Sequence, residues 1–457
     1  MGQPPRVKSR AQYQGAMTAL GSAQWIKPLR SASIVSIGKA MQAVMSLVFI
    51  ALAARALGME AFGMLVLIHG LVFGLSQIIR FQTWQAVVRY GAQALQTNDT
   101  DRLQRLVKFT TMLDVIAAII GITLIMVVSG PAGDLFKVPP DLHDEMSLYG
   151  ISILAMVMTA TPLGVLRLLD RFDLIAIQTT IAPAIRLAGT LYLFLTGGGL
   201  IGFLAVWFVA TIVSRIALLA MAWGQLGKEG LLENIGQRHE SQLMPEVGIW
   251  RFILAHNLSR GLFLSQAQMG LLIAGGLLGP AVAGVFRIAQ QFADILIRPA
   301  TKLLMPAIYP ELAKLQAVQD HDLRRSMILR TALLAGGIAA TVLIILTVSG
   351  KTMITSFVGA DYAAAYIPML WLALAGMITV IAFPLEPLLS STGRMKHIVM
   401  AEFLATIFYL VLVLVLAEPY GLTGVSMATL GAVLSSTFIL ALSGRDLIIG
   451  KRPPQQV

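Results

Sequence analysis

Residues 36–52 read SIGKAMQAVMSLVFIAL, an apolar helical segment that contains one lysine, Lys39. With its flanks this segment is long enough to cross a bilayer, which takes about 20 mostly apolar residues. The rest of the chain has the same character. Of its 457 residues, 57% are hydrophobic and 12% are charged, and the mean hydropathy is +0.78. This composition excludes an ordinary soluble fold and predicts an all-α polytopic membrane protein.

Apolar windows of spanning length recur along the whole chain and predict about twelve transmembrane helices. They cover residues 31–54, 62–83, 107–129, 146–168, 174–196, 200–222, 249–275, 281–305, 328–349, 364–389, 397–417 and 421–443. The first 30 residues are polar and basic and lack the short apolar core of a secretory signal, so we expect an uncleaved cytoplasmic tail. The chain has no cysteine, which excludes thiol catalysis, disulfides and cysteine-ligated metal.

Lysine and arginine are concentrated on alternate loops. One set contains Arg6, Lys8, Arg10, Lys27, Arg30, Arg89, Arg102, Arg105, Lys108, Arg167, Arg171, Lys228, Arg238, Lys314, Arg324, Arg325, Arg394, Lys396, Arg445, Lys451 and Arg452. The opposite set contains only Arg55, Lys137 and Lys351. This distribution follows the positive-inside rule and predicts that both termini are cytoplasmic. It also explains the net charge of +11 without a nucleic acid partner.

The two halves of the chain are related by an offset of 221 residues, which aligns Lys39 with Arg260 and Gly58 with Gly279. Six spans in each half predict two six-helix lobes of parallel topology, related by a pseudo-twofold axis along the membrane normal. The predicted division is a basic cytoplasmic tail (1–30), an N-terminal lobe (31–222), a cytoplasmic linker (223–248), a C-terminal lobe (249–445) and a second cytoplasmic tail (446–457).

Polar residues inside the spans recur every three or four positions and therefore lie on one face of each helix. A charged side chain at mid-bilayer costs about 2.5–3.5 kcal/mol on insertion scales, so such residues usually face a cavity. We expect helices one, two, seven and eight to line it. The candidate cavity residues are Lys39, Gln42, Arg80, Arg186, Asn257, Arg260, Arg287, Gln291 and Arg298. Snorkelling to headgroups also explains Arg80 and Arg215, and a structural salt bridge also explains Asp294 with Arg298.

Acids are fewer than bases within the spans, and Asp294 and Glu386 are the candidates for ion coupling. Glu386 lies in FPLEPLL, whose prolines predict a bend in the tenth helix near its cytoplasmic end. A satisfied structural acid is the alternative. Because bases exceed acids, the expected guest is an anion, and lysine and arginine suit phosphate well. No catalytic group, metal ligand set or cofactor is predicted; His69 is expected to be a hydrogen-bonded packing residue.

Several short motifs carry a family resemblance. They are LGMEAFG (57–63), VVRYGAQ (87–93), LLGPAVAGVFRIAQ (277–290), GRMK (393–396) and GLTGVSMATL (421–430). Over residues 30–445 the sequence resembles the bacterial polysaccharide exporters, the Wzx-type lipid-linked oligosaccharide flippases. Their superfamily includes the multidrug and toxin extrusion transporters and the lipid II flippases. The resemblance implies two lobes around a cavity that opens alternately to each side.

The resemblance also implies a cargo, an undecaprenyl diphosphate-linked oligosaccharide, and contacts to it from basic residues. The matching positions are Lys39, Arg80, Arg260, Arg287 and Arg298. One departure stands out. Family members commonly carry an acid before the turn of the seventh helix, whereas this chain has SQAQMGLLIAGG (265–276) with Gln266 and Gln268. Ion coupling through that position is therefore in doubt.

The expected function is transfer of this cargo from the cytoplasmic to the periplasmic leaflet of the bacterial inner membrane, for O-antigen, capsule or exopolysaccharide synthesis. The expected partners are the cargo, membrane lipids and a polysaccharide polymerase. Two alternatives remain open. A cation-coupled multidrug antiporter of the same fold needs buried acids. A membrane polymerase or ligase needs catalytic groups outside the membrane, and the longest loop of that kind, about 130–145, shows none.

Overall fold

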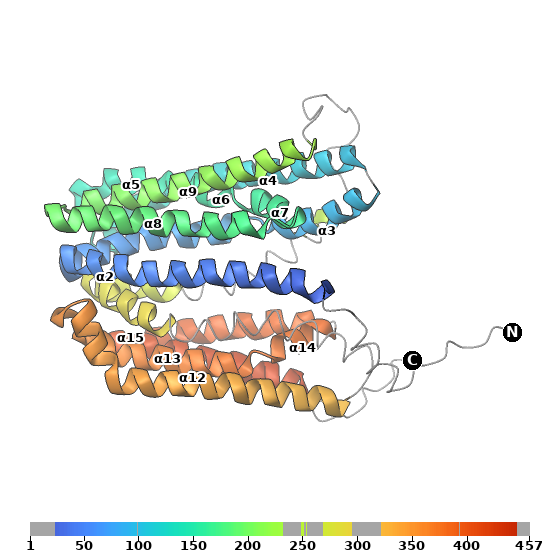
Figure 1. Cartoon of the computed structure of the whole chain (residues 1–457). Helices are drawn as coiled ribbons and strands as arrows, with labels where there is room; N and C mark the ends of the chain where they lie inside the picture. Colours follow the sequence, from blue (N-terminus) through green and yellow to red (C-terminus); the bar gives the residue numbers. More distant parts are fainter. Residues whose placement is uncertain are drawn as a thin grey trace.

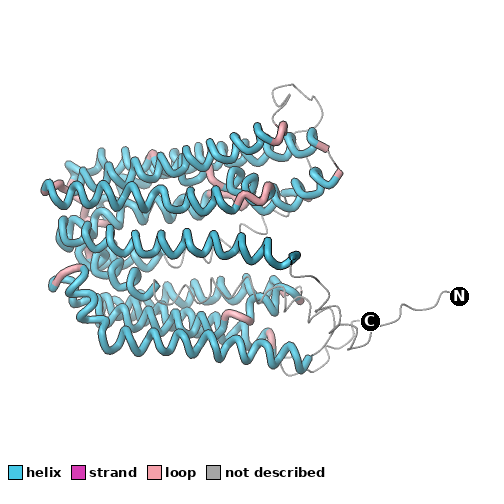
Figure 2. Tube along the Cα trace, in the orientation of Figure 1, coloured by secondary structure: helices cyan, strands magenta, loops and turns pink. Residues whose placement is uncertain are grey.

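The computed structural model describes residues 23–97, 99–231, 248–250, 253, 268–294, 321–392 and 394–445, and these residues form helices joined by short turns (Figures 1 and 2). The α-helices are α2 (Ala23–Ile79), α3 (Thr83–Gln96), α4 (Thr100–Leu135), α5 (His143–Gly150), α6 (Ser152–Val157), α7 (Ala160–Leu168), α8 (Phe172–Thr196), α9 (Leu200–Lys228), α12 (His321–Phe357), α13 (Tyr366–Ala382), α14 (Leu385–Ser391) and α15 (Met395–Ser443). Short 3₁₀ turns, η1 (Pro140–Leu142) and η2 (Ala360–Ala365), precede α5 and α13.

Two of the long helices each contain a pair of spans. The backbone leaves helical geometry at Gly58 inside α2 and at Gly421 inside α15, where both glycines have positive φ. Eight helices of the described residues are long and apolar enough to cross a membrane. Helical residues 268–278 and 280–294 belong to the predicted seventh and eighth spans. The predicted all-α fold of about twelve spans is confirmed.

The helices form two lobes, α2 to α9 and α12 to α15, which lie one above the other in Figure 1. One buried apolar cluster runs through both lobes and includes Phe62, Leu271 and Tyr362. Away from this cluster each lobe has its own core: Val165 and Leu218 belong to the core of the first lobe, and Leu389 to that of the second. The lobes therefore share a core over only part of their length.

The lobes meet at a surface that we call the inter-lobe seal, formed by residues 54–63, 279–284 and 356–362. Glycine allows close backbone contact there. A Cβ at Gly63 would overlap the carbonyl of Pro280, and a Cβ at Gly284 would lie 2.8 Å from the carbonyl oxygen of Met59. These two contacts are equivalent under the 221-residue offset. The predicted pseudo-twofold relation is thus visible as a reciprocal contact.

Two longer side chains complete the inter-lobe seal. The guanidinium of Arg55 donates hydrogen bonds to the backbone carbonyls of Ser356 and Val358, at the carboxyl end of α12. The Tyr362 hydroxyl donates to the carbonyl of Ala54 at 3.2 Å. A cation is favourable at a helix carboxyl terminus, where free carbonyls carry partial negative charge. The seal therefore combines apolar packing with directional hydrogen bonds.

Three predicted spans are interrupted in the structure. The break between α13 and α14, at Phe383 and Pro384, confirms the predicted bend in the tenth helix. The second span breaks after Ile79 and continues as α3, and the fourth consists of α5, α6 and α7. The third helix is longer than its window and runs through Pro131 to Leu135, so the predicted loop at 130–145 is mostly helical.

Candidate functional site

A polar cavity of about 250 Å³ lies within the first lobe, and we call it the N-lobe pocket. Its lining comes from both halves of α2 and from α6, α8 and α9. The lining residues are Gln42, Ser46, Phe49, His69, Phe73, Met156, Gln178, Thr179, Ala182, Pro183, Arg186, Thr211, Ser214 and Arg215. This lining, drawn from the described part of the chain, contains arginine, amide and hydroxyl groups but no carboxylate.

Helical periodicity places the polar groups of the N-lobe pocket on facing stripes. On α8, Gln178, Ala182 and Arg186 recur every four residues, and on α9 Thr211 is followed four residues later by Arg215. Residues at this spacing share one face of a helix. Because α8 packs along both α2 and α9, the two stripes meet in the space between these three helices.

Arg186 is held in place mainly by aromatic rings. Its guanidinium carbon lies 4.8 Å from the ring centre of Trp207 and 5.9 Å from that of Phe49, distances at which a cation is attracted to a π face. Its Nη2 donates a hydrogen bond of 3.1 Å to Thr211 Oγ1. Its Nε is buried and has no acceptor in the structure. The ring contacts orient the guanidinium but leave part of its hydrogen-bonding capacity unused.

The side chain of Arg215 has fewer hydrogen-bond partners than the side chain of Arg186. It lies near the middle of α9, its Nε is buried without an acceptor, and no hydrogen bond or carboxylate contact of its side chain occurs within the described residues. Two other cations, Arg80 and Arg186, act on it electrostatically. In a low-dielectric setting these like charges repel one another more strongly than in water. The pocket is therefore a region of uncompensated positive charge.

The neutral polar residues of the pocket are well ordered. His69 Nδ1 shares a hydrogen bond of 2.6 Å with the Tyr149 hydroxyl, and its ring stacks against Phe73. Gln178 Nε2 donates to Ser214 Oγ at 2.9 Å, which ties α8 to α9. The predicted packing role of His69 is confirmed, although the same residue also lines the pocket.

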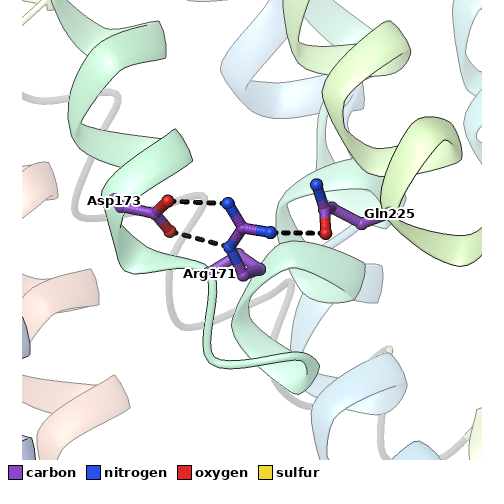
Figure 3. Close-up of polar contacts among 3 residues, drawn as sticks. All are labelled: Arg171, Asp173 and Gln225. Carbon is purple, nitrogen blue, oxygen red and sulfur yellow. Dashed lines mark hydrogen bonds and ion pairs between the residues drawn. The ribbon is translucent and has the colours of Figure 1, made fainter. Parts of the chain in front are cut away.

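An arginine at the edge of the first lobe provides a contrast, because its guanidinium is paired with a carboxylate. Arg171, just before α8, binds both carboxylate oxygens of Asp173 and also donates to the side chain of Gln225 (Figure 3). The hydrogen bonds to Asp173 raise the pKa of Arg171 above its usual value. Neither Arg186 nor Arg215 has such a carboxylate partner in the described part of the chain.

The structure brings some of the predicted site residues together and separates others. Gln42 and Arg186 line the N-lobe pocket. Lys39, one turn from Gln42 on α2, is exposed and does not line it. Arg80, at the end of the second span, donates to Gln77 and Thr159. The pocket thus involves helices one, two, four, five and six, whereas the cavity expected from the sequence lies among helices one, two, seven and eight.

The remaining predicted residues belong to the second half of the chain. Arg287 and Asp294 are half-buried and Gln291 is buried in helical residues 280–294, whereas Glu386 is exposed on α14. Arg287 acts electrostatically on His69, so it lies near the N-lobe pocket. Three further predicted residues lie outside the described residues: Asn257, Arg260 and Arg298.

Sequence reasoning left Arg215 out of the cavity, because window 200–222 places it near the end of a span. The structure extends α9 to Lys228, so Arg215 is near the middle of this helix, and its side chain lines the N-lobe pocket. The four-residue spacing of Thr211 and Arg215 is a polar stripe that was available in the sequence.

Comparison with known proteins identifies a family for this chain and solved structures of similar fold. The family described as polysaccharide biosynthesis protein matches residues 29–316. The chain is 30% identical over 352 residues to "Inner membrane protein YghQ" of Escherichia coli (strain K12), and the alignment covers 74% of this chain and 94% of that protein.

Similar solved structures include a lipid flippase and a multidrug transporter. Lipid II flippase MurJ in an inward closed conformation has a TM-score of 0.66 at 12% identity, covering 90% of this chain and 87% of that one. A multidrug resistance MATE family transporter of the MOP superfamily, in an inward-facing conformation, has a TM-score of 0.64 at 13% identity, covering 93% of this chain and 98% of that one. At these identities the likeness shows a shared two-lobe fold and nothing about cargo.

Proposed function

This chain belongs to the polysaccharide biosynthesis protein family, and from that premise we propose that it is a flippase for a lipid-linked oligosaccharide. Its cargo is a polyprenyl diphosphate-linked oligosaccharide of the undecaprenyl type. The protein moves this cargo from the cytoplasmic to the periplasmic leaflet of the bacterial inner membrane, where a polysaccharide polymerase uses it. The similarity to an inner membrane relative and to flippase folds supports this assignment.

The observation that carries the proposal is a positively charged interior in a two-lobe membrane fold. Arg186 and Arg215 lie near the middle of their helices, and no acid lines the N-lobe pocket among the residues that the structure describes. Charged groups at such depth are costly and usually functional. Guanidinium groups bind phosphate and carboxylate well, so the interior favours an anionic cargo.

The mechanism is alternating access by rocking of the two lobes. The inter-lobe seal holds the lobes together at the end that contains Arg55, and the positive-inside pattern makes this the periplasmic end. The glycan and diphosphate enter from the cytoplasmic side, while the prenyl chain stays in the lipid. Lys39, Arg80, Arg260, Arg287 and Arg298 contact the diphosphate. Asp294 and Glu386 are the residues proposed for any ion coupling.

The membrane potential assists such a step, because outward movement of one negative charge gains about 2.3 kcal/mol per 100 mV when the inside is negative. A multidrug antiporter has the opposite requirement, since a cationic drug needs buried acids. Asp114 is a buried acid of the first lobe, but its carboxylate already accepts hydrogen bonds from Thr83 and from the backbone of Thr161. The charge of the interior therefore supports the flippase over the antiporter.

The test reconstitutes the purified full-length protein in liposomes that contain a polyprenyl diphosphate-linked oligosaccharide. A glycosidase added outside measures how much cargo is reachable. The wild type raises the cleaved fraction from about half, the outer-leaflet share, to nearly all. The double variant Lys39→Ala/Arg260→Ala leaves it near half. Lys351→Ala, which removes an exposed lysine of α12 next to the seal, is the matched control and behaves as wild type.

Two results oppose the proposal. Full flipping by the double variant contradicts the proposed role of Lys39 and Arg260. A wild type that leaves the cargo half-protected but exchanges a cationic drug for protons is an antiporter instead.

A further inference from the structure

The positive charge of the N-lobe pocket is not neutralised by acidic side chains of its described lining. Arg186 and Arg215 both line it and interact electrostatically, and each has a buried Nε without an acceptor. No carboxylate lines the cavity within the described chain. Two nearby cations in a low-dielectric region repel each other, and a buried unpartnered donor costs about 1–3 kcal/mol. Without a ligand the site is electrostatically incomplete.

The chemistry of the two arginines indicates which kind of ligand completes the site. A guanidinium presents N–H groups in a planar fork that matches the two oxygens of a carboxylate or phosphate. Arg186 is already oriented by Trp207 and Thr211, so little side-chain freedom is lost when a ligand binds. Arg171, with its Asp173 carboxylate, shows in the same chain the kind of partner that the pocket lacks (Figure 3).

Size and lining limit the ligand further. A cavity of about 250 Å³ has room for about eight waters or one ring-sized group, since one water occupies about 30 Å³ in the liquid. It is too small for a prenyl chain or a whole oligosaccharide. Amide and hydroxyl groups of Gln42, Ser46 and Thr179 face the same cavity, and Phe49 and Phe73 supply apolar wall. This combination fits a polar ring that carries one anionic group.

We propose that the N-lobe pocket is an oxyanion site, in which Arg186 and Arg215 bind one carboxylate or phosphate group and Gln42 and Gln178 contact the polar ring that carries it. An acidic sugar has this chemistry. The site lies inside the first lobe, close to Arg80 and Arg287, two of the cations proposed to contact the diphosphate. That the ring is an acidic sugar of the cargo rests on the proposed function, whereas anion binding by the two arginines does not.

The experiment measures ligand binding to the purified full-length protein, without transport. Glucuronate, inorganic phosphate and glucose are titrated at matched ionic strength by calorimetry, and thermal unfolding is followed in parallel. A ligand that binds the folded state raises the unfolding temperature with concentration. We expect glucuronate or phosphate to bind and glucose not to. Stronger binding of glucuronate identifies an acidic sugar as the ligand, and stronger binding of phosphate identifies a phosphate group.

Variants locate the site. Arg186→Gln and Arg215→Gln each remove a charged hydrogen-bond donor, worth about 1.5–3 kcal/mol, so affinity falls about tenfold or more. Arg171→Gln is the matched control and keeps wild-type affinity. Because Arg215 makes no hydrogen bond within the described chain, Arg215→Gln leaves the fold intact. It relieves repulsion, so the unliganded variant unfolds at a higher temperature than the wild type.

Three results overturn the proposal. The first is equal stabilisation by glucose and glucuronate. The second is unchanged anion affinity in both pocket variants. The third is a lower unfolding temperature of Arg215→Gln with no anion binding by the wild type, which makes Arg215 a structural residue. If flipping fails in liposomes but these anions still bind through Arg186 and Arg215, the oxyanion site stands and the proposed function does not.

Discussion

Asp114 and Arg215 are both charged residues in membrane helices, and they differ in how their polar atoms are satisfied. The Asp114 carboxylate accepts a hydrogen bond of 3.0 Å from the Thr83 hydroxyl and one of 2.9 Å from the Thr161 amide, which joins three helices. Arg215 has no such partners in the described part of the chain. Removing a partner from a satisfied buried charge destabilises the fold, whereas a buried charge without partners calls for an explanation, such as a bound ligand.

Asp114→Asn tests the structural role of this acid. Asparagine keeps one acceptor oxygen but turns an NH₂ group toward one of the two donors, so we expect a loss of about 1–3 kcal/mol in stability. The measurement is thermal unfolding in detergent, with the exposed Asp141→Asn as control. An unchanged unfolding temperature together with lost transport contradicts this role and points to proton coupling through Asp114.

At the scale of elements, the glycine turns of the inter-lobe seal decide how closely the lobes approach. Gly58 and Gly279 have φ of 72° and 96°, a conformation that other residues rarely adopt. Five residues after each turn, Gly63 and Gly284 bring the two helix backbones into contact. The same short motif, repeated once in each half of the chain, thus forms the two sides of one interface.

Gly63→Ala tests this close approach. The added Cβ overlaps the carbonyl of Pro280, so the helices must separate and the sealed state is destabilised by about 1–3 kcal/mol, as expected for overpacking. The unfolding temperature of the purified protein falls. Gly130→Ala in α4 is the control, because nothing lies within 4 Å of its added Cβ. Equal unfolding temperatures of the two variants contradict the contact.

At the scale of the whole molecule, the lobes share a large apolar core that includes the inter-lobe seal, and each lobe also has a core of its own. A smaller buried cluster packs Ile249 and Ile253 against α3 and α4. Lobes that each have a core of their own can move as rigid units, which is what rocking requires. The seal must then break in each transport cycle. Its hydrogen bonds from Arg55 and Tyr362 to backbone carbonyls break and re-form without leaving a buried charge in the apolar core.

A cross-link across the inter-lobe seal tests this motion. The chain has no native cysteine, so Arg55→Cys/Ser356→Cys introduces the only thiols, both at exposed positions. A cleavable thiol cross-linker about as long as an arginine side chain joins them. We expect transport to stop on cross-linking and to return after reduction.

The control pair for this cross-link lies within one lobe. Tyr366 donates a hydrogen bond to the carbonyl of Thr347, so Thr347→Cys/Tyr366→Cys links α12 to α13 and leaves transport unaffected. Continued transport with the seal cross-linked contradicts the rocking mechanism.

The sequence by itself determined the number of spans, the pairing of the two glycine turns and the break at FPLEPLL. These features follow from local properties: apolar length sets a span, and glycine and proline act on their own backbone. The interrupted second and fourth helices were not predictable in this way, because tertiary contacts satisfy the backbone groups that each break exposes.

Only the tertiary structure decided which polar residues meet. Gln42 faces the N-lobe pocket while Lys39, less than one turn away, does not, and this depends on the rotation of α2 against α8. Arg215 enters the pocket because of the way α9 packs against α8 and α2. Periodicity places residues on one face of a helix, but the neighbour of that face is set by packing between helices far apart in the sequence.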